Sequence, residues 1–158
     1  MSTRLKNVMP APAAQKVTYQ SLHRYTVDAN RRVQMPLAWR SAKPVELTMI
    51  VWPQHDCGPC LRVLPPDQME KLREKIENML PAEKTSLKRH IGSYSARVRL
   101  DSAKRIIIPE EMAVAADIRD QVVFAGMLDY FEMWSPIRHA NLLAKEGLVL
   151  TGAFKGIE

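Results

Sequence analysis

We predict an α/β protein of the α+β type, in which two duplicated lobes of short strands and helices form one barrel-like unit with pseudo-two-fold symmetry. The main observation is a stretch that occurs twice, as residues 25–36 (YTVDANRRVQMP) and as residues 98–109 (VRLDSAKRIIIP). Asp, Arg and Pro recur in both copies, each 73 positions apart. Self-similarity at a fixed offset is typical of one structural unit used twice. The second observation is size, because each half of a 158-residue chain is small for a domain that folds alone.

The duplication divides the chain into two lobes and three connecting or terminal segments. Residues 1–20 mix Ser, Lys, Pro, Ala and Gln without periodicity, which predicts a flexible basic tail. We expect the first lobe at residues 21–80 and the second at residues 94–145. The polar and basic residues 81–93 are expected to act as a linker between them. Residues 146–158 are expected to form a loosely held C-terminal tail.

The first lobe is predicted to alternate short strands with helices. Apolar runs predict its strands, and apolar residues recurring on one face from Met69 to Met79 predict its longest helix. Pro66 opens that helix and Pro81 stops it, because Pro is tolerated only in the first turn. The expected elements are strands at 22–27 and 32–35, a short helix from Pro36, strands at 46–52 and 60–64, and a helix at 66–79.

The second lobe is predicted to repeat this order. Pro109 opens a short helix, and Glu110 and Glu111 favour the positive end of that helix. Ser135 and Pro136 open the final helix, at the place that Pro65 and Pro66 occupy in the first lobe. The expected strands are 94–100, 105–108, 121–126 and 130–134.

Composition narrows the class of protein. Hydrophobic residues make up 46% of the chain, so a real core is expected, and the net charge of +6 suits nucleic acid or another anionic partner. Two cysteines are too few for a disulfide-stapled secreted scaffold. The N-terminus lacks the pattern of a secretory signal, and no apolar run approaches the roughly 18 residues that span a bilayer. We therefore expect a cytoplasmic protein without a membrane partner.

Each copy of the repeat contains a turn that begins with an acid and ends with two cations. An Asp at the start of a tight turn can accept hydrogen bonds from backbone amides two or three residues later, and it can pair with an Arg at the end. A guanidinium oriented in this way can bind a phosphate, or guanine in the major groove, with two hydrogen bonds. The alternative is that the ion pair only stabilises a hairpin. Because the turn occurs twice in the same surroundings, we expect it to bind DNA.

Further cations flank the two turns and predict a basic stripe. Arg97 and Arg99 share one face of a strand with a period of two, and Lys104 follows at the turn. Each phosphate that such a stripe neutralises steepens the salt dependence of binding by about 0.9 log units per log unit of salt. The candidate DNA-binding residues are Arg24, Asp28, Arg31, Arg32, Arg97, Arg99, Asp101, Lys104 and Arg105.

At these residues the chain resembles the MraZ family, the duplicated relatives of the AbrB-type swapped-hairpin DNA-binding proteins. That family carries a turn of the type Asp-x-x-Gly-Arg in each lobe, followed by apolar residues, Pro and a short helix. The corresponding turns here are residues 28–32 (DANRR) and 101–105 (DSAKR). Residues 122–127 (VVFAGM) and 131–136 (FEMWSP) also look family-like, and the resemblance spans roughly residues 20–145.

The resemblance implies two SpoVT-AbrB-like lobes and a sequence-specific transcriptional regulator that is not an enzyme. It also implies action on a bacterial cell division and cell wall gene cluster, association with the nucleoid, and closed homo-oligomeric rings that bind direct repeats of double-stranded DNA. Arg32 and Arg105 match the functional arginines of the family, and Asp28 and Asp101 match the aspartates that organise them. No catalytic residue, metal, cofactor or small-molecule substrate is expected.

The chain departs from the family pattern at one position in each turn, where Arg31 and Lys104 replace the family Gly. Gly allows a positive φ, and another residue in that conformation costs about 1 kcal/mol or more. Either both turns are rebuilt, or the strain is tolerated and two charges are added. Two other readings of the function therefore stay open: a non-specific nucleoid-associated DNA-binding protein, and a ring-forming interaction protein that does not bind DNA.

Cys57 and Cys60 offer two further alternatives. A thioredoxin-type redox pair requires its first Cys at a helix N-terminus, whereas a short strand follows here. Zinc would need a fourth ligand besides His55, Cys57 and Cys60, which His90 or a neighbouring subunit would have to supply. We interpret the two cysteines as a pair of loop thiols.

Overall fold

The computed structural model describes residues 16–53, 56–98 and 100–158, so most of the expected basic tail at residues 1–20 lies outside the described residues. The eight predicted strands are all present, and one helix, at residues 81–93, was not predicted. The elements are β1 (Leu22–Thr26), β2 (Arg32–Gln34), the 3-10 helix η2 (Leu37–Trp39), β3 (Leu47–Trp52), β4 (Cys60–Leu64), α1 (Pro66–Glu77), α2 (Pro81–Ser93), β5 (Ser95–Val98), β6 (Arg105–Ile107), α3 (Glu110–Ala115), β7 (Gln121–Gly126), β8 (Phe131–Trp134) and α4 (Pro136–Lys155).

Six of the strands form one antiparallel sheet in the order β1-β7-β8-β4-β3-β5, and β2 pairs with β6 in a separate ribbon. This order is symmetric with respect to the two halves of the chain: listed from the other edge, it has the corresponding strand of the other half at each place, β5 for β1, β3 for β7 and β4 for β8. The first strand of each half pairs with the third strand of the other half, since β1 pairs with β7 and β5 pairs with β3. The last strands of the halves, β4 and β8, meet in the middle. The two halves therefore interleave their strands in one sheet with a pseudo-two-fold arrangement.

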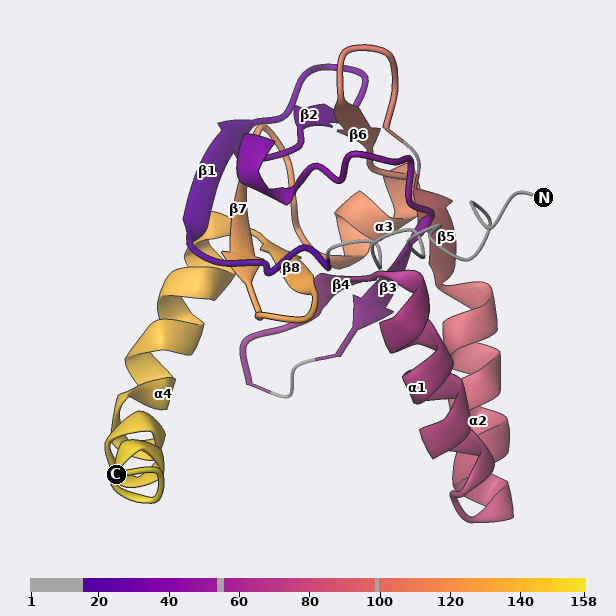
Figure 1. Cartoon of the computed structure of the whole chain (residues 1–158), viewed down its shortest axis with the longest axis vertical. Coiled ribbons are helices and arrows are strands. Elements are labelled where there is room, and N and C mark those ends of the chain that lie inside the picture. Colours follow the sequence, from indigo (N-terminus) through magenta and orange to yellow (C-terminus); the bar gives the residue numbers. More distant parts are fainter. Residues whose placement is uncertain (1–15, 54–55, 99) are drawn as a thin grey trace, which may run out of the picture.

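The sheet is open, which corrects the expectation of a barrel-like unit. Strands β1 and β5 lie at opposite edges of the six-stranded sheet, and no pairing among the described residues joins them. The β2–β6 ribbon covers one face of the sheet instead (Figure 1). A three-residue ribbon is too short to continue the hydrogen-bonded ladder around the core, so the class is α+β without closure.

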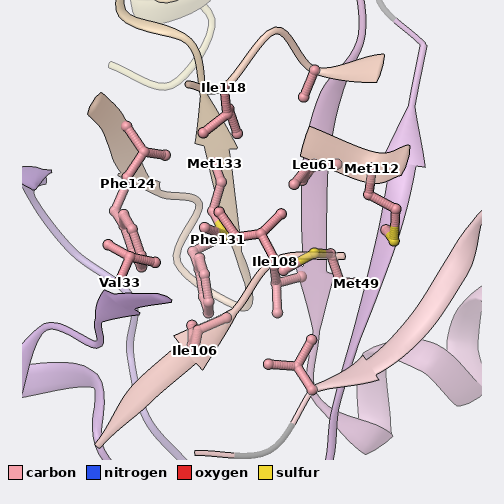
Figure 2. Packing of buried hydrophobic residues seen from close by; sticks show 14 of the residues in the cluster. Val33, Met49, Leu61, Ile106, Ile108, Met112, Ile118, Phe124, Phe131 and Met133 are labelled. Atoms are coloured by element: carbon pink, nitrogen blue, oxygen red, sulfur yellow. The ribbon is translucent and has the colours of Figure 1, made fainter. Parts of the chain in front are cut away.

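The main core lies between the ribbon and the sheet. Val33 of β2 and Ile106 of β6 are opposite each other in the ribbon and are almost fully buried. Figure 2 shows Val33 close to Phe124 of β7 and Ile106 close to Phe131 of β8. The tryptophan of η2, Trp39, is 2% exposed and donates from Nε1 to the carbonyl of Gln20 at 3.0 Å. Burial of these side chains therefore fixes the ribbon on the sheet.

Helices α1, α2 and α4 project from the other side of the sheet, away from the ribbon (Figure 1). Here an ion pair joins the two halves: Arg62 of β4 donates to Oε2 of Glu132 on β8 at 2.9 Å and at 3.1 Å. Trp134 donates to the other carboxylate oxygen of Glu132 at 3.1 Å, and the Arg62 guanidinium lies 3.9 Å from the ring centre of Trp52. Because Glu132 is buried, loss of one partner would leave an uncompensated charge.

Residues 81–93, which we expected to act as a linker, form helix α2. Pro81 opens this helix at its first turn, where the missing N–H costs nothing. Leu87 and Ile91 pack with Ile76 of α1, so α1 and α2 form a helical hairpin. The polar composition reflects the large exposed surface of that hairpin rather than an irregular connection.

Residues 146–158, which we expected to form a loose tail, continue helix α4 as far as Lys155. Ser135 caps the helix by accepting from the amide of Arg138 at 3.2 Å, and Pro136 follows at the first turn. The final turns are exposed and contain no proline, so nothing local ends the helix earlier. None of the helices in the described part of the chain has the length and apolarity that a membrane span requires.

A methyl group at position 126 would clash with the backbone of Tyr19 and Gln20. The Cβ of an alanine there would lie 2.7 Å from the carbonyl carbon of Tyr19 and 2.9 Å from Cα of Gln20. Two hydrogen bonds with Leu128, at 2.8 and 3.0 Å, hold the backbone of Tyr19 in place. We therefore expect Gly126→Ala to lower the free energy of unfolding by about 1–3 kcal/mol in urea titrations. Gly147→Ala is the matched control, because nothing lies within 4 Å of its Cβ in the exposed part of α4, and there we expect stabilisation.

Candidate nucleic-acid interface

The first duplicated turn is organised by the carboxylate of Asp28. Its Oδ1 accepts from the amides of Asn30 at 2.9 Å and of Arg32 at 2.8 Å, and its Oδ2 accepts from Nε of Arg32 at 2.8 Å. The backbone closes the same turn, since the amide of Arg31 donates to the carbonyl of Asp28 at 2.9 Å. The Asp side chain therefore orders both the loop and the guanidinium that follows.

The second turn reproduces this geometry. Oδ1 of Asp101 accepts from the amides of Ala103 and Arg105, both at 2.9 Å, and Oδ2 accepts from Nε of Arg105 at 3.0 Å. The amide of Lys104 donates to the carbonyl of Asp101 at 2.9 Å. The aspartate therefore accepts the same three hydrogen bonds in both turns, although the residues between Asp and Arg differ.

These hydrogen bonds lower the pKa of both carboxyl groups. The largest cause is the backbone amide of Arg32 for Asp28 and that of Arg105 for Asp101, and the arginine side chains add to it. Because the folded-state pKa lies below the unfolded value of about 3.9, this stabilisation is present above that pH. It is lost as the pH falls through the lowered pKa, so both turns keep their charged form at neutral pH.

The positions where the family pattern has Gly adopt a left-handed backbone despite their side chains. Arg31 has a φ of 60° and Lys104 a φ of 62°. Each carbonyl is held by the other half of the molecule: that of Lys104 accepts from the amide of Met35 at 3.0 Å, and that of Arg31 from the amide of Ile108 at 2.9 Å. Of the two outcomes we considered, the turns are not rebuilt, and contacts between the halves maintain the strained conformation.

The ribbon register places the two turn arginines on one face. Arg32 lies opposite Ile107 and Arg105 lies opposite Gln34, while the intervening pair of Val33 and Ile106 points into the core. Side chains alternate between the two faces of a strand, so these four residues share the outer face. Arg32 and Arg105 are diagonal neighbours there, with Cα atoms about 7–8 Å apart. Figure 1 shows both turns side by side at the ribbon end of the molecule.

Both guanidinium groups are fixed but reachable. The side chains of Arg32 and Arg105 are 34% and 32% exposed. In both, Nε is the atom that contacts the aspartate, which leaves the terminal amino groups to donate outward. Two donors in a fixed plane match a phosphate or the O6 and N7 atoms of guanine.

The other predicted cations are distributed between both faces. Arg31 lies at its turn and donates from Nε to the carbonyl of Ile108 at 3.0 Å, and Lys104 is exposed at the second turn. Arg24 of β1 is opposite Val123, whose side chain packs on the helix side of the sheet. Arg97 of β5 alternates with the buried Val98, and its Nε lies 3.0 Å from Glu46.

The structure therefore brings Arg31, Arg32, Lys104 and Arg105 together and places Arg24 and Arg97 on the opposite face of the sheet. Arg99, which completed the expected basic stripe, lies outside the described residues. The sequence reasoning did not single out Gln34 and Ile107, which share the outer face of the ribbon. Both residues lie two positions from a turn arginine in the same strand, and since side chains alternate between the faces of a strand, this spacing could have identified them.

The alternative sites at the cysteines find no support in the described residues. Cys57 and Cys60 are thiols, and Cys60 opens strand β4 instead of a helix. Burial raises the pKa of the Cys60 thiol strongly, which disfavours the reactive thiolate. No cluster of three or more His, Cys, Asp or Glu side chains in the described part of the chain is placed to hold a metal ion, although His55 lies outside it.

Comparison with known proteins identifies relatives over most of the chain. Residues 94–150 match the family model described as "MraZ protein, putative antitoxin-like". A protein of Ralstonia nicotianae named "Transcriptional regulator MraZ" is 33% identical over 129 residues, which cover 81% of this chain and 87% of the relative. A protein of Roseiflexus castenholzii with the same name is 32% identical over 124 residues, which cover 77% of this chain and 84% of the relative.

The strained turn at Lys104 gives a direct test of the geometry. Lys104→Gly removes the cost of a positive φ, whereas Lys104→Ala removes the same side chain and keeps that cost. We expect the Gly variant to exceed the Ala variant by about 1 kcal/mol in the free energy of unfolding, measured by urea titration. Equal stability of the two variants would mean that the second turn has no left-handed residue.

Proposed function

This chain belongs to the MraZ family, and from that premise we propose that it binds double-stranded DNA in a sequence-specific manner through its two Asp-x-x-x-Arg turns. Family membership makes the chain a transcriptional regulator rather than an enzyme. The turns are the part of the surface that we assign to DNA. The observation that carries the proposal is the common outer face that Arg32 and Arg105 share on the β2–β6 ribbon.

The shape of this end of the molecule fits a major groove. A two-stranded ribbon is narrow enough to enter that groove, and its outer side chains then meet the edges of the bases. Arg32 and Arg105 would donate to guanine or to phosphate, while Gln34 lies opposite Arg105 on the same face. The aspartates hold the guanidinium groups before binding, so little conformational entropy remains to be lost.

Arg31 and Lys104, the cations at the left-handed positions, favour a second candidate function, which is DNA binding with weaker sequence preference. Lys104 is exposed beside the ribbon, where its charge reaches phosphates without reading a base. A general nucleoid-coating protein would use the same face in this way. We prefer specific binding, because the ordered turn arginines are better suited to base edges than a flexible lysine is.

We further propose that copies of the chain assemble, as a ring that would act in the cytoplasm at the nucleoid on the cell division and cell wall gene cluster. The support is the apolar surface of helix α4. His139 is buried under the sheet, and Leu143, Leu150 and Phe154 follow it at the spacing of one helix face. These three side chains are 49%, 46% and 60% exposed. Linked subunits would bind repeated sites with an avidity that single contacts lack.

The central test replaces both turn arginines. With Arg32→Ala and Arg105→Ala together, we expect the affinity for a duplex carrying the upstream promoter region of the gene to fall by about 100-fold. Fluorescence anisotropy at several salt concentrations measures this loss, and circular dichroism checks that the fold is kept. Arg24→Ala with Arg97→Ala is the matched control, because it removes the same number of charges from the other face of the sheet. That control should change the affinity by less than about threefold.

The same titrations separate the rival functions. An unrelated duplex that competes as well as the promoter would support a nucleoid-coating protein, and an absence of salt-sensitive DNA association would support an interaction protein. If the control pair costs as much affinity as the turn pair, the ribbon is not the recognition surface.

Assembly through α4 predicts a second pair of variants. Leu150→Glu with Phe154→Glu places two charges on the apolar face, so we expect sedimentation to show a lower oligomeric state. Leu148→Glu is the control, since this residue is 90% exposed and lies on another side of the helix. An unchanged oligomer in the double variant would place the subunit contact elsewhere.

A further inference from the structure

A large cavity lies beside the second turn, on the ribbon side of helix α1. Its volume is about 750 Å³, within the range of about 300–1,000 Å³ that is typical of small-molecule sites. Its wall is formed by residues 16–19, the loop between η2 and β3, and the N-terminus of α1. Neither the duplication nor the DNA-binding proposal accounts for a hollow of this size.

The floor of the cavity is apolar and aromatic. Trp39 and Tyr19 pack edge to face with ring centres 5.5 Å apart, and both also pack against the ring of Phe131 in the core. Met35 and Leu47 line the same floor. Because these side chains belong to the main core, the floor is rigid and favours a flat or aliphatic group over water.

The rim of the cavity is charged, and two of its three carboxylates are paired with cations. Asp67 pairs with Lys16 at 3.0 Å, and Glu46 pairs with Arg97 at 3.0 Å. Asp129 also acts electrostatically on Lys16. In the part of the chain that the structure describes, no carboxylate lies within salt-bridge distance of Lys43 or Lys104, which both line the cavity. Asp129 lines the cavity without an ion-pair partner among the described residues, but Arg40, Lys43 and Lys104 outweigh this one carboxylate, so the net charge at the rim is positive.

Arg40 also lines the cavity, and its hydrogen bonds hold the backbone of the cavity wall in place. Its Nε and Nη2 donate to the carbonyl of Met35 at 3.1 and 2.9 Å. The amide of Met35 in turn donates to the carbonyl of Lys104. Residues that line the cavity thus hold the backbone of the second turn, so an occupant would contact the turn directly.

We propose that this cavity binds a small amphipathic organic anion, with an aromatic or aliphatic body on the Trp39 floor and an anionic head between Lys43 and Lys104. The apolar floor supplies the affinity for the body, and the two lysines select the charge of the head. A purely inorganic anion would leave the floor without a partner, and a neutral hydrocarbon would leave the lysines without one.

Two dyes that share an aromatic body test this assignment. Anilinonaphthalene sulfonate carries an anionic head, and phenylnaphthylamine does not. Titrated by fluorescence against the full chain, the sulfonate should bind at least about fivefold more tightly than the neutral dye. Lys43→Gln with Lys104→Gln should weaken the sulfonate about tenfold and change the neutral dye less than twofold, because only the anion contacts the lysines.

Two controls locate the dye. Lys71→Gln with Lys155→Gln removes the same charge from exposed positions outside the cavity and should leave both dyes unchanged. Ala42→Trp places a large side chain in the cavity wall and should abolish the tight site. The proposal is overturned if both dyes bind equally, if the two lysine pairs have the same effect, or if Ala42→Trp leaves the sulfonate bound, which would put the dye on the apolar face of α4. These measurements need no DNA, so they succeed or fail independently of the proposed DNA binding.

Discussion

The pairing of β2 with β6 is the constraint on which the rest of the arrangement depends. These strands come from different halves of the chain, and each contributes only three residues to the ribbon. Burial of Val33 and Ile106 against the sheet determines which face of the ribbon points inward. Because side chains alternate, this burial also determines that Arg32 and Arg105 point outward together. A slip of one strand by one residue would turn its arginine toward the core and separate the two arginines onto opposite faces.

The strained residues show how one half of the molecule stabilises the other. Arg31 and Lys104 keep a backbone conformation that Gly adopts without cost. Their carbonyls accept hydrogen bonds from the opposite copy of the repeat, at Ile108 and Met35. Each half of the molecule therefore depends on the other for the geometry of its turn. The chain gains two cations beside its ribbon as a result.

The two faces of the sheet have different characters. The ribbon face carries ordered arginines above the main hydrophobic core, and the other face carries long helices with exposed apolar residues such as Leu150 and Phe154. The buried pair of Arg62 and Glu132 lies on the helix side, where the halves meet. This separation lets the proposed DNA contact and the proposed subunit contact act on one molecule without competing for surface.

The sequence by itself determined the local features: the doubled turn, the Asp–Arg pairing within it and the order of the strands, because these depend on hydrogen bonds and periodicities between near neighbours. The tertiary structure decided which cations act together. Arg24 and Arg97 look equivalent to Arg32 along the chain, yet the strands that pair with them, more than 40 residues away, turn them to the other face. The open sheet likewise depends on pairing between distant strands. The helix at residues 81–93 differs, because Pro81 and the apolar pair Leu87 and Ile91 are local signals that its polar composition concealed.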